Sequence, residues 1–366
     1  MFRFLRGWFV LVVACFALAG QAQDFEALKN AAEKKDAKAL EVIQRAAEQG
    51  NAKAQYALGD LYSAGRGITQ NGAEATKWWR KAAEGFRRAA EQGDAEAQEK
   101  LGQLYSTGIG VTQNSAESTK WYRKAAEGFQ RTAEQGNAKA QYNLGQMYRF
   151  GRGVAMNDAQ GAKWIRKAAE QGYVEAQTLL AFLYEGGLGV ARNNAEGMKW
   201  LRKAAEQGDV RSQNDLGNRY ANGNGVARNG AEAVKWYRKA AEQGDADGQN
   251  NLGSMYAKGQ GVERNYAEAV KWQRKAAEQG HRDAQYRLGE MYANGQGVAK
   301  NEAEAVRLWG EAAKPLDCEC DAEPDIEPKK SLRKLAKQGN KDAQQMLKKL
   351  GLDVNNDSHF EYIEYD

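Results

Sequence analysis

The sequence predicts an all-α protein: an α-solenoid of about seven helix-turn-helix units with a helical cap at each end. Three observations predict it. A run reading Ala-Ala-Glu-Gln-Gly recurs along the chain at regular spacing, once with Thr in place of its first Ala. Ala, Glu, Lys and Gln, which favour helices, are abundant, and the chain of 366 residues contains only 3 Pro. A chain of this length also exceeds the roughly 250–300 residues at which a single hydrophobic core stops growing.

Composition excludes several classes of protein. The 9 Trp and 16 Tyr supply enough apolar surface to argue against disorder. The 2 His and 3 Cys leave little material for histidine catalysis, a Cys/His metal cage or a disulfide scaffold, so we expect no cofactor and no metal. The net charge of +5 is spread over a long chain and does not predict nucleic-acid binding.

Residues 1–22 are typical of a cleaved signal peptide. Arg3 and Arg6 form its basic end, an apolar run follows, and small residues precede Gln23. The run is too short to span a bilayer comfortably, so we expect a periplasmic or secreted protein with no membrane span. Lipoprotein processing at Cys15 is the alternative, although apolar residues continue beyond that cysteine.

Residues 23–45 are expected to form an N-terminal capping helix region. The end of a solenoid exposes an apolar face and needs such a cap. Phe25, Leu28, Leu40 and Ile43 are its candidate apolar contacts.

Residues 46–311 comprise the seven repeats. The spacing between successive units is 43 residues twice and then 36, from the unit starts at Ala46, Ala89, Thr132, Ala168, Ala204, Ala240 and Ala276. Each 43-residue spacing contains seven extra residues, which add almost two helical turns and turn the downstream face by only about 20°. We therefore expect longer second helices in units one and two.

The first helix of each unit begins after a Gly followed by a capping residue, as in Gly50-Asn51. Ala54, Leu58 and Leu61 then form an apolar stripe at helical spacing. A mid-helix glycine recurs in six units and is replaced by Ala181 in the fourth. Because such a glycine costs about 1 kcal/mol against alanine, we expect a neighbouring helix to approach closely there.

A Gly-x-Gly turn joins the two helices, and an Asn-x-x-Glu or Asn-x-x-Gln capping box opens the second. The second helix carries one Trp per unit, which we expect in the core between units. The seventh unit moves this aromatic by one place, to Trp309.

These motifs, Ala-x-x-x-Leu-Gly-x-x-Tyr, Gly-x-Gly-Val and Lys-Trp-Tyr-Arg-Lys-Ala-Ala-Glu-x-Gly, resemble the Sel-one-like repeat, a relative of the tetratricopeptide repeat. The resemblance implies a right-handed superhelix whose first helices line a concave groove. It also implies an adaptor in protein–protein contacts, often in the bacterial envelope or at a host interface. Some exported, cysteine-rich relatives have been linked to β-lactam binding or hydrolysis, whereas the repeats of this chain contain no cysteine.

Three segments follow the repeats. Residues 312–330 are expected to form an acidic, proline-containing loop, residues 331–351 a partial repeat that caps the solenoid, and residues 352–366 an acidic aromatic tail. In the loop, Cys318 and Cys320 fall short of a four-ligand zinc site, but cation binding and a disulfide stay open. The tail has the carboxylate spacing of a calcium loop but lacks its central Gly. Its aromatic residues could instead form a short peptide that docks on a partner.

The candidate binding surface is the face of the first helices that varies between units. Its four positions in each unit are spaced i, i+3, i+4, i+7 and so lie on one face. We hypothesise that side-chain amides, which can pair with backbone N–H and C=O groups, hold an extended peptide between aromatic neighbours. The candidate residues are Tyr56, Tyr142, Phe182, Asn214, Asn218, Asn250, Asn251 and Tyr286.

The leading functional hypothesis is an exported, non-enzymatic scaffold that binds a protein or extended peptide in the concave groove. The alternative is a protein that binds or hydrolyses a cell-wall glycan or a β-lactam. A Ser-x-x-Lys nucleophile motif is not evident in the sequence, and only His281 and His359 could act as histidine bases.

Overall fold

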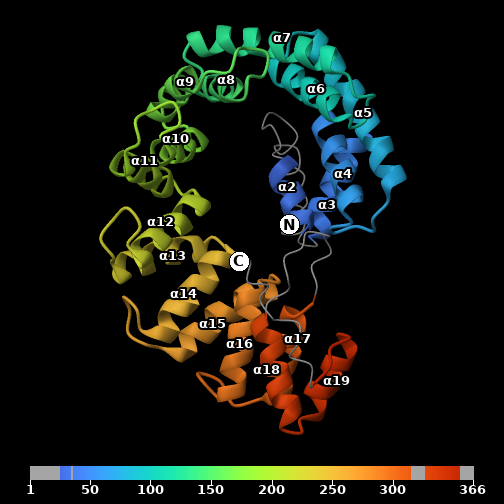
Figure 1. The fold of residues 1–366 in the computed structure, drawn as a ribbon. Coiled ribbons are helices and arrows are strands. Elements are labelled where there is room, and N and C mark those ends of the chain that lie inside the picture. The colour runs from blue at the N-terminus through green and yellow to red at the C-terminus, as the bar shows by residue number, and fades with distance from the viewer. Residues whose placement is uncertain (1–24, 34–35, 315–325, 355–366) are drawn as a thin grey trace, which may run out of the picture. The chain divides into compact units, whose positions relative to one another are not determined.

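The computed structural model describes residues 25–33, 36–314 and 326–354 (Figure 1). These residues form 18 helices and no strand, which confirms the predicted all-α solenoid. None of the described helices combines the length and apolar character needed to cross a bilayer. The chain divides into two compact units, residues 1–161 and 162–366, and each is described by itself.

The first unit begins with the predicted N-terminal cap. Helices α2 (Phe25–Glu33) and α3 (Ala37–Glu48) pack on each other and on α4 (Ala52–Ala64). Phe25 and Ile43 are buried in this core, and Leu28 and Leu40 pack against it. The hairpins follow: α4 with α5 (Gly72–Glu91), α6 (Ala95–Thr107) with α7 (Ser115–Glu134), and then α8 (Ala138–Phe150).

The boundary between the two units crosses α9 (Asp158–Glu170). The second unit continues with three hairpins: α10 (Val174–Gly186) with α11 (Asn194–Glu206), α12 (Val210–Asn222) with α13 (Gly230–Glu242), and α14 (Ala246–Lys258) with α15 (Tyr266–Glu278). A fourth hairpin pairs α16 (Arg282–Asn294) with α17 (Glu302–Ala312), and α18 (Ile326–Lys337) and α19 (Lys341–Lys349) close the unit.

The C-terminal cap begins earlier than the sequence suggested. Helix α18 starts at Ile326, five residues before the expected start of the partial repeat at 331. Pro328 lies in its first turn, where the backbone N–H that proline lacks would have no partner within the helix. Leu332, Ala336, Ala343 and Leu347 of the cap bury themselves against α17.

The second helices of units one and two are longer, as predicted. Helices α5 and α7 have 20 residues each, whereas α13 and α15 have 13. The extra two turns bury Phe86 and Phe129, so the insertions enlarge the core without interrupting the stacking.

The capping box is only half formed. The side chain of Asn71 accepts a hydrogen bond from the backbone N–H of Glu74, as predicted. The carboxylate of Glu74, however, accepts from Lys77 and from the indole of Trp78 instead of returning to Asn71. The backbone N–H of Asn71 donates to the carbonyl of Tyr62 at 2.9 Å. This bond between the end of the first helix and the start of the second recurs in every unit and closes the turn.

Tryptophans occupy the core between helices, as predicted. Six of the indoles are between 1% and 9% exposed: Trp78, Trp121, Trp200, Trp236, Trp272 and Trp309. Lysines one residue before and three residues after the indole lie over the rings of Trp78, Trp121, Trp236 and Trp272. For Trp236 the two ammonium groups, those of Lys235 and Lys239, lie 5.7 and 4.3 Å from the ring centre.

The mid-helix glycine meets the side chain that follows the tryptophan. A Cβ on Gly217 would lie 2.6 Å from two ring carbons of Tyr237, and one on Gly289 would lie 2.5 Å from the indole nitrogen of Trp309. This confirms the expected close approach and explains the shifted aromatic of unit seven. In unit four, where the glycine is Ala181, the residue corresponding to Tyr237 is the smaller Leu201.

The glycines of the interhelical turn have two roles. Gly259 and Gly261 adopt left-handed φ angles of 68° and 71°, which L side chains rarely adopt. A Cβ on Gly261 would also lie 1.9 Å from the backbone carbon of Gly230 in the preceding unit. The turn therefore contacts the neighbouring hairpin backbone directly.

Gly217→Ala is expected to destabilise the second unit by about 1–3 kcal/mol, because the added methyl overlaps the ring of Tyr237. Combining it with Tyr237→Leu recreates the Ala181–Leu201 pair of unit four, so the double variant should lose less than the sum of the single variants. Urea unfolding followed by circular dichroism measures both effects. Gly72→Ala is the control, since nothing lies within 4 Å of its added Cβ. Strict additivity would contradict the proposed packing.

Candidate protein-binding face

In the second compact unit, residues 162–366, the variable face is lined by polar side chains from two neighbouring first helices. Helix α12 contributes Asn214 and Asn218, and α14 contributes Asn250 and Asn251. Asn214, Asn218 and Asn251 are half-buried rather than fully solvated, and a hydrogen bond between Asn251 and Asn214 joins α14 to α12. The face is therefore partly a seam between repeats.

Asn214 and Asn251 are brought together by this packing. The amide Nδ2 of Asn251 donates to Oδ1 of Asn214 at 3.0 Å, across the boundary between two repeats. An amide pair held in this way still has an unused N–H donor and carbonyl lone pair at its ends. These two residues thus retain the chemistry that a peptide backbone needs.

Asn218 is already engaged within its own hairpin. Its Oδ1 accepts from the hydroxyl of Tyr237 on α13 at 2.8 Å. Burial raises the pKa of Tyr237 to about 12, so the phenol stays neutral and keeps donating at neutral pH. We therefore assign Asn218 a mainly structural hydrogen bond.

Asn250 lies inside the fold, contrary to the hypothesis that it contacts a peptide at the surface. It is 6% exposed, and its Oδ1 has no hydrogen-bond partner. Gln273 on α15 is 1% exposed, and its Oε1 is also unpaired. The Nε2 of Gln273 donates to the backbone carbonyl of Asn250 at 3.0 Å. The helical periodicity placed Asn250 on the variable face but could not show how closely α15 covers it.

The two aromatic neighbours differ in accessibility. Phe182 on α10 is 56% exposed and belongs to the variable face. Tyr286 on α16 packs against the core of the C-terminal cap, and its carbonyl accepts from the indole of Trp309 at 3.1 Å. Burial raises the pKa of Tyr286. Phe182 is thus the aromatic available to a ligand.

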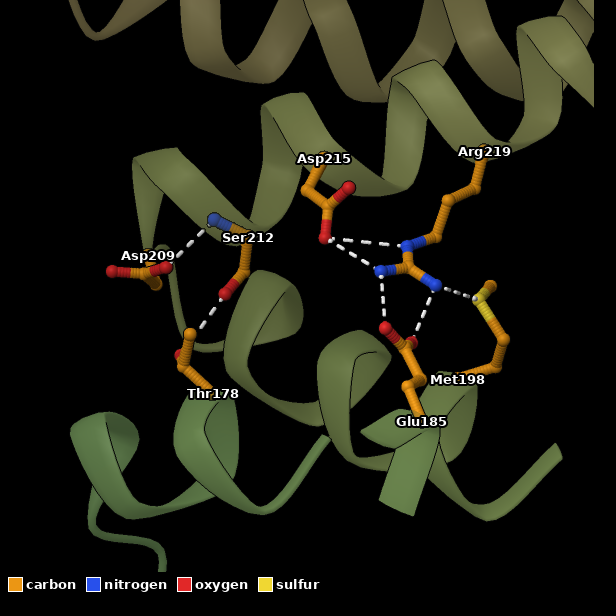
Figure 2. A network of polar contacts seen from close by, with 7 residues as sticks. All are labelled: Thr178, Glu185, Met198, Asp209, Ser212, Asp215 and Arg219. Carbon is orange, nitrogen blue, oxygen red and sulfur yellow. Dashed lines mark hydrogen bonds and ion pairs between the residues drawn. The ribbon is translucent and has the colours of Figure 1, made fainter. Parts of the chain in front are cut away.

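Figure 2 shows a network of polar contacts that joins residues of α10, α11 and α12. Arg219 on α12 binds Glu185 on α10, with Nη2–Oε2 at 2.9 Å, and Asp215 on its own helix at 3.1 Å. Burial by itself would lower the pKa of Arg219, but its bonds to Glu185 and Asp215 outweigh burial and raise it. Thr178 and Ser212 join the same helices at 3.1 Å. The network fixes the spacing of α10 and α12.

Tyr56 and Tyr142 belong to the other unit and are not part of this face. The ammonium of Lys100 lies 3.6 Å from the ring centre of Tyr56, and burial raises the pKa of that phenol. The hydroxyl of Tyr142 accepts from Gln146 at 3.0 Å. Both tyrosines are half-buried.

Two sets of recurring contacts were missed by the sequence analysis. An arginine of the second helix donates to the tyrosine hydroxyl of the next first helix, as from Arg238 to Tyr256 at 2.7 Å. A buried glutamine donates to the last turn of the preceding helix, as from Gln213 to the carbonyl of Ala205 at 3.0 Å. These residue types recur at fixed positions, so comparing the copies within the chain could have revealed both.

The expected signal peptide with Cys15, the loop with Cys318 and Cys320, and most of the tail, including His359 and the calcium-like loop, lie outside the described residues. His281 caps the first turn of α16, where its Nδ1 accepts from the backbone N–H of Ala284 at 3.3 Å. Across residues 25–33, 36–314 and 326–354, His, Cys, Asp and Glu form no cluster of three able to hold a metal ion.

The fold and its repeated contacts define an α-solenoid of helical hairpins. A family model described as the Sel1 repeat matches seven segments: residues 52–85, 95–128, 138–173, 174–209, 210–245, 246–281 and 282–314. These matches cover more than half of the chain, so the chain belongs to the Sel1 repeat family. Members of this family are typically scaffolds for protein–protein interaction and generally not enzymes.

Several solved structures resemble the chain. A Sel1 repeat protein from Oxalobacter formigenes is 34% identical, with 72% of this chain and 98% of that chain covered and a TM-score of 0.49. A protective antigen present in uropathogenic Escherichia coli strains is 29% identical, with coverage of 90% and 95% and a TM-score of 0.26. Cysteine rich protein B from Helicobacter pylori is 32% identical, covering 34% of this chain and 93% of its own, with a TM-score of 0.27. None of the curated proteins matches.

Tyr237→Phe should lower the unfolding free energy by about 1 kcal/mol at pH 7, because it removes the hydrogen bond to Asn218. The raised pKa of Tyr237 means that its contribution is present below pH 10 and is lost as the pH rises toward about 12. The difference between wild type and variant should therefore shrink above pH 10. Urea unfolding at a series of pH values measures it, and a gap that is constant up to the highest usable pH would contradict the assignment.

Proposed function

We propose that this protein is an exported, non-enzymatic scaffold that binds an extended segment of a partner protein along the variable face of its second unit. The observation that carries the proposal is the exposed Phe182 on α10, beside a face lined by the amides of the next two first helices. An aromatic anchor next to backbone-pairing amides suits a peptide, since the ring supplies affinity and the amides supply orientation.

The binding residues are fewer than the sequence suggested. Phe182, Asn214 and Asn251 carry groups that a peptide can reach. Asn218 and Asn250 support them from within, through Tyr237 and Gln273. Arg219, held by Glu185 and Asp215, keeps α10 and α12 at a fixed spacing, so the partner meets a preformed surface and less entropy is lost on binding.

Site-specific photocrosslinking tests the proposal. A photoreactive amino acid at Phe182 and another at Arg211, an exposed position of α12, should each crosslink the same protein in the native cell envelope. The matched control is Lys235, an exposed position of the second helix α13. Capture at Phe182 and Arg211 but not at Lys235 is expected, and yield should fall in the Asn214→Leu/Asn251→Leu variant. Equal capture from all three positions would argue against a specific face.

The proposal of export rests on residues 1–22 and has its own test. Mass spectrometry of the protein purified from its native cells should give a chain beginning at Gln23, and Cys15→Ser should leave both mass and location unchanged. A lipid-modified chain that begins at Cys15 would show that the lipoprotein alternative is right. An unprocessed chain in the cytoplasm would refute export.

A further inference from the structure

The end of α8 and the turn that follows it expose two large apolar side chains. Phe150 is 55% exposed and Met156 is 71% exposed. The other units place small or polar residues at the position of Phe150: Ala64, Thr107, Gly186, Asn222, Lys258 and Asn294. At the position of Met156 they place only Gln, Arg or Lys. The repeat architecture does not require either residue in unit three.

The two side chains flank one turn. A Cβ on Gly151, the residue after Phe150, would lie 3.3 Å from Cβ of Met156. Met156 therefore sits directly over the backbone next to Phe150. Two neighbouring exposed apolar side chains form a small patch of the kind that marks a contact site.

Two arginines flank the phenyl ring. The guanidinium carbons of Arg149 and Arg152 lie 5.3 and 5.2 Å from the centre of the Phe150 ring. The Arg152 guanidinium also lies 5.8 Å from the ring of Tyr122. These distances are within the range of cation–π attraction, so the aromatic rings hold both cations at the patch.

Among the residues that the structure describes, neither arginine has a carboxylate at hydrogen-bonding distance. Within the described part of the chain, Arg149 forms no ion pair, its Nη1 lies 3.5 Å from Oε1 of Gln146, and its Nε is buried without a partner. The nearest carboxylate oxygen to Arg152 is Oε1 of Glu99 at 3.8 Å, close to the outer limit of an ion pair. Arg219, by contrast, holds its carboxylates at hydrogen-bonding distance. Within the described residues, the charge of Arg149 is thus unpaired and that of Arg152 is only loosely paired.

We propose that Arg149, Phe150, Arg152 and Met156, here called the arginine–phenylalanine patch, dock an acidic peptide segment that carries an aromatic side chain. The aromatic side chain packs on Phe150 and Met156, and adjacent carboxylates bind the guanidinium groups. A guanidinium beside an aromatic ring keeps in-plane N–H donors for a bidentate carboxylate. The patch lies in the first unit, so it is independent of the face proposed above.

The charge distribution favours a peptide over a nucleic acid. A single-stranded nucleic acid needs a track of cations along its backbone as well as stacking side chains. Here the patch offers the two guanidinium groups of Arg149 and Arg152, and one of them lies 3.8 Å from the Glu99 carboxylate, which is fewer cations than a row of phosphates needs. A short acidic segment matches the patch better.

Fluorescence anisotropy with the full chain tests the proposal. The probe is a labelled peptide, acetyl-Glu-Asp-Phe-Glu-Tyr-Asp-Glu-amide. We expect a Kd of roughly 10–100 μM, which should rise as salt is added. Arg149→Gln/Arg152→Gln should weaken binding at least tenfold, and Phe150→Ser several-fold. Arg264→Gln, at the exposed position of unit six that corresponds to Met156, is the matched control and should bind like the wild type.

Circular dichroism and urea unfolding confirm that each variant is folded, and Phe150→Ser acts at an exposed position. A second probe with every Asp and Glu replaced by Asn and Gln should bind at least tenfold more weakly. The proposal is overturned if the acidic peptide does not bind, if the arginine variants bind it as well as the wild type, or if an oligothymidylate of similar length binds more tightly.

Discussion

The close approach of the two helices within each hairpin is the constraint on which the rest of the structure depends. In most repeats it is made possible by a glycine in the middle of the first helix, against which a side chain of the second helix packs, and in the fourth repeat by Ala181 with the smaller Leu201. Gly217 with Tyr237 and Gly289 with Trp309 show the arrangement most clearly. The adjacent tryptophan of the second helix is thereby directed into the core, and the next hairpin packs against it. A mid-helix glycine is intrinsically unfavourable, so its gain comes from tertiary packing rather than helix propensity.

Much of this architecture was predictable from the sequence, because the repeats can be compared with one another. A residue type kept at the same position in most repeats indicates that the same contact is made in each. The fixed Asn, Gly and Trp positions correctly predicted the helix starts, the turns and the core. The seven inserted residues correctly predicted longer second helices. The fate of Glu74 was not predictable in the same way, since Lys77, Trp78 and the backbone of Asn71 all compete for a carboxylate at that position. Only the three-dimensional arrangement decides that competition.

The candidate binding face was less predictable, for a physical reason. Helical periodicity shows which residues share a face, but exposure depends on the neighbouring helices that cover that face. Asn214, Asn218 and Asn250 occupy similar helical positions, and yet one pairs with an amide, one accepts from a phenol and one is buried. The arginine–phenylalanine patch was missed because it consists of departures from the repeat, and Phe150 and Met156 stand out only once their exposure is known.

In residues 162–366, buried glutamines of the first helices accept hydrogen bonds from exposed glutamines at the ends of second helices. Gln243 donates to Oε1 of Gln213 at 2.8 Å, and Gln279 donates to Oε1 of Gln249 at the same distance. Each accepting glutamine in turn donates to the end of the helix before it. Removing the side chain of Gln213 would leave the carbonyl of Ala205 and the amide of Gln243 without this hydrogen-bond partner. An unsatisfied buried group costs about 1–3 kcal/mol. Thermal fraying that starts at one end would therefore be resisted at each amide link, and neighbouring hairpins should melt together rather than one at a time.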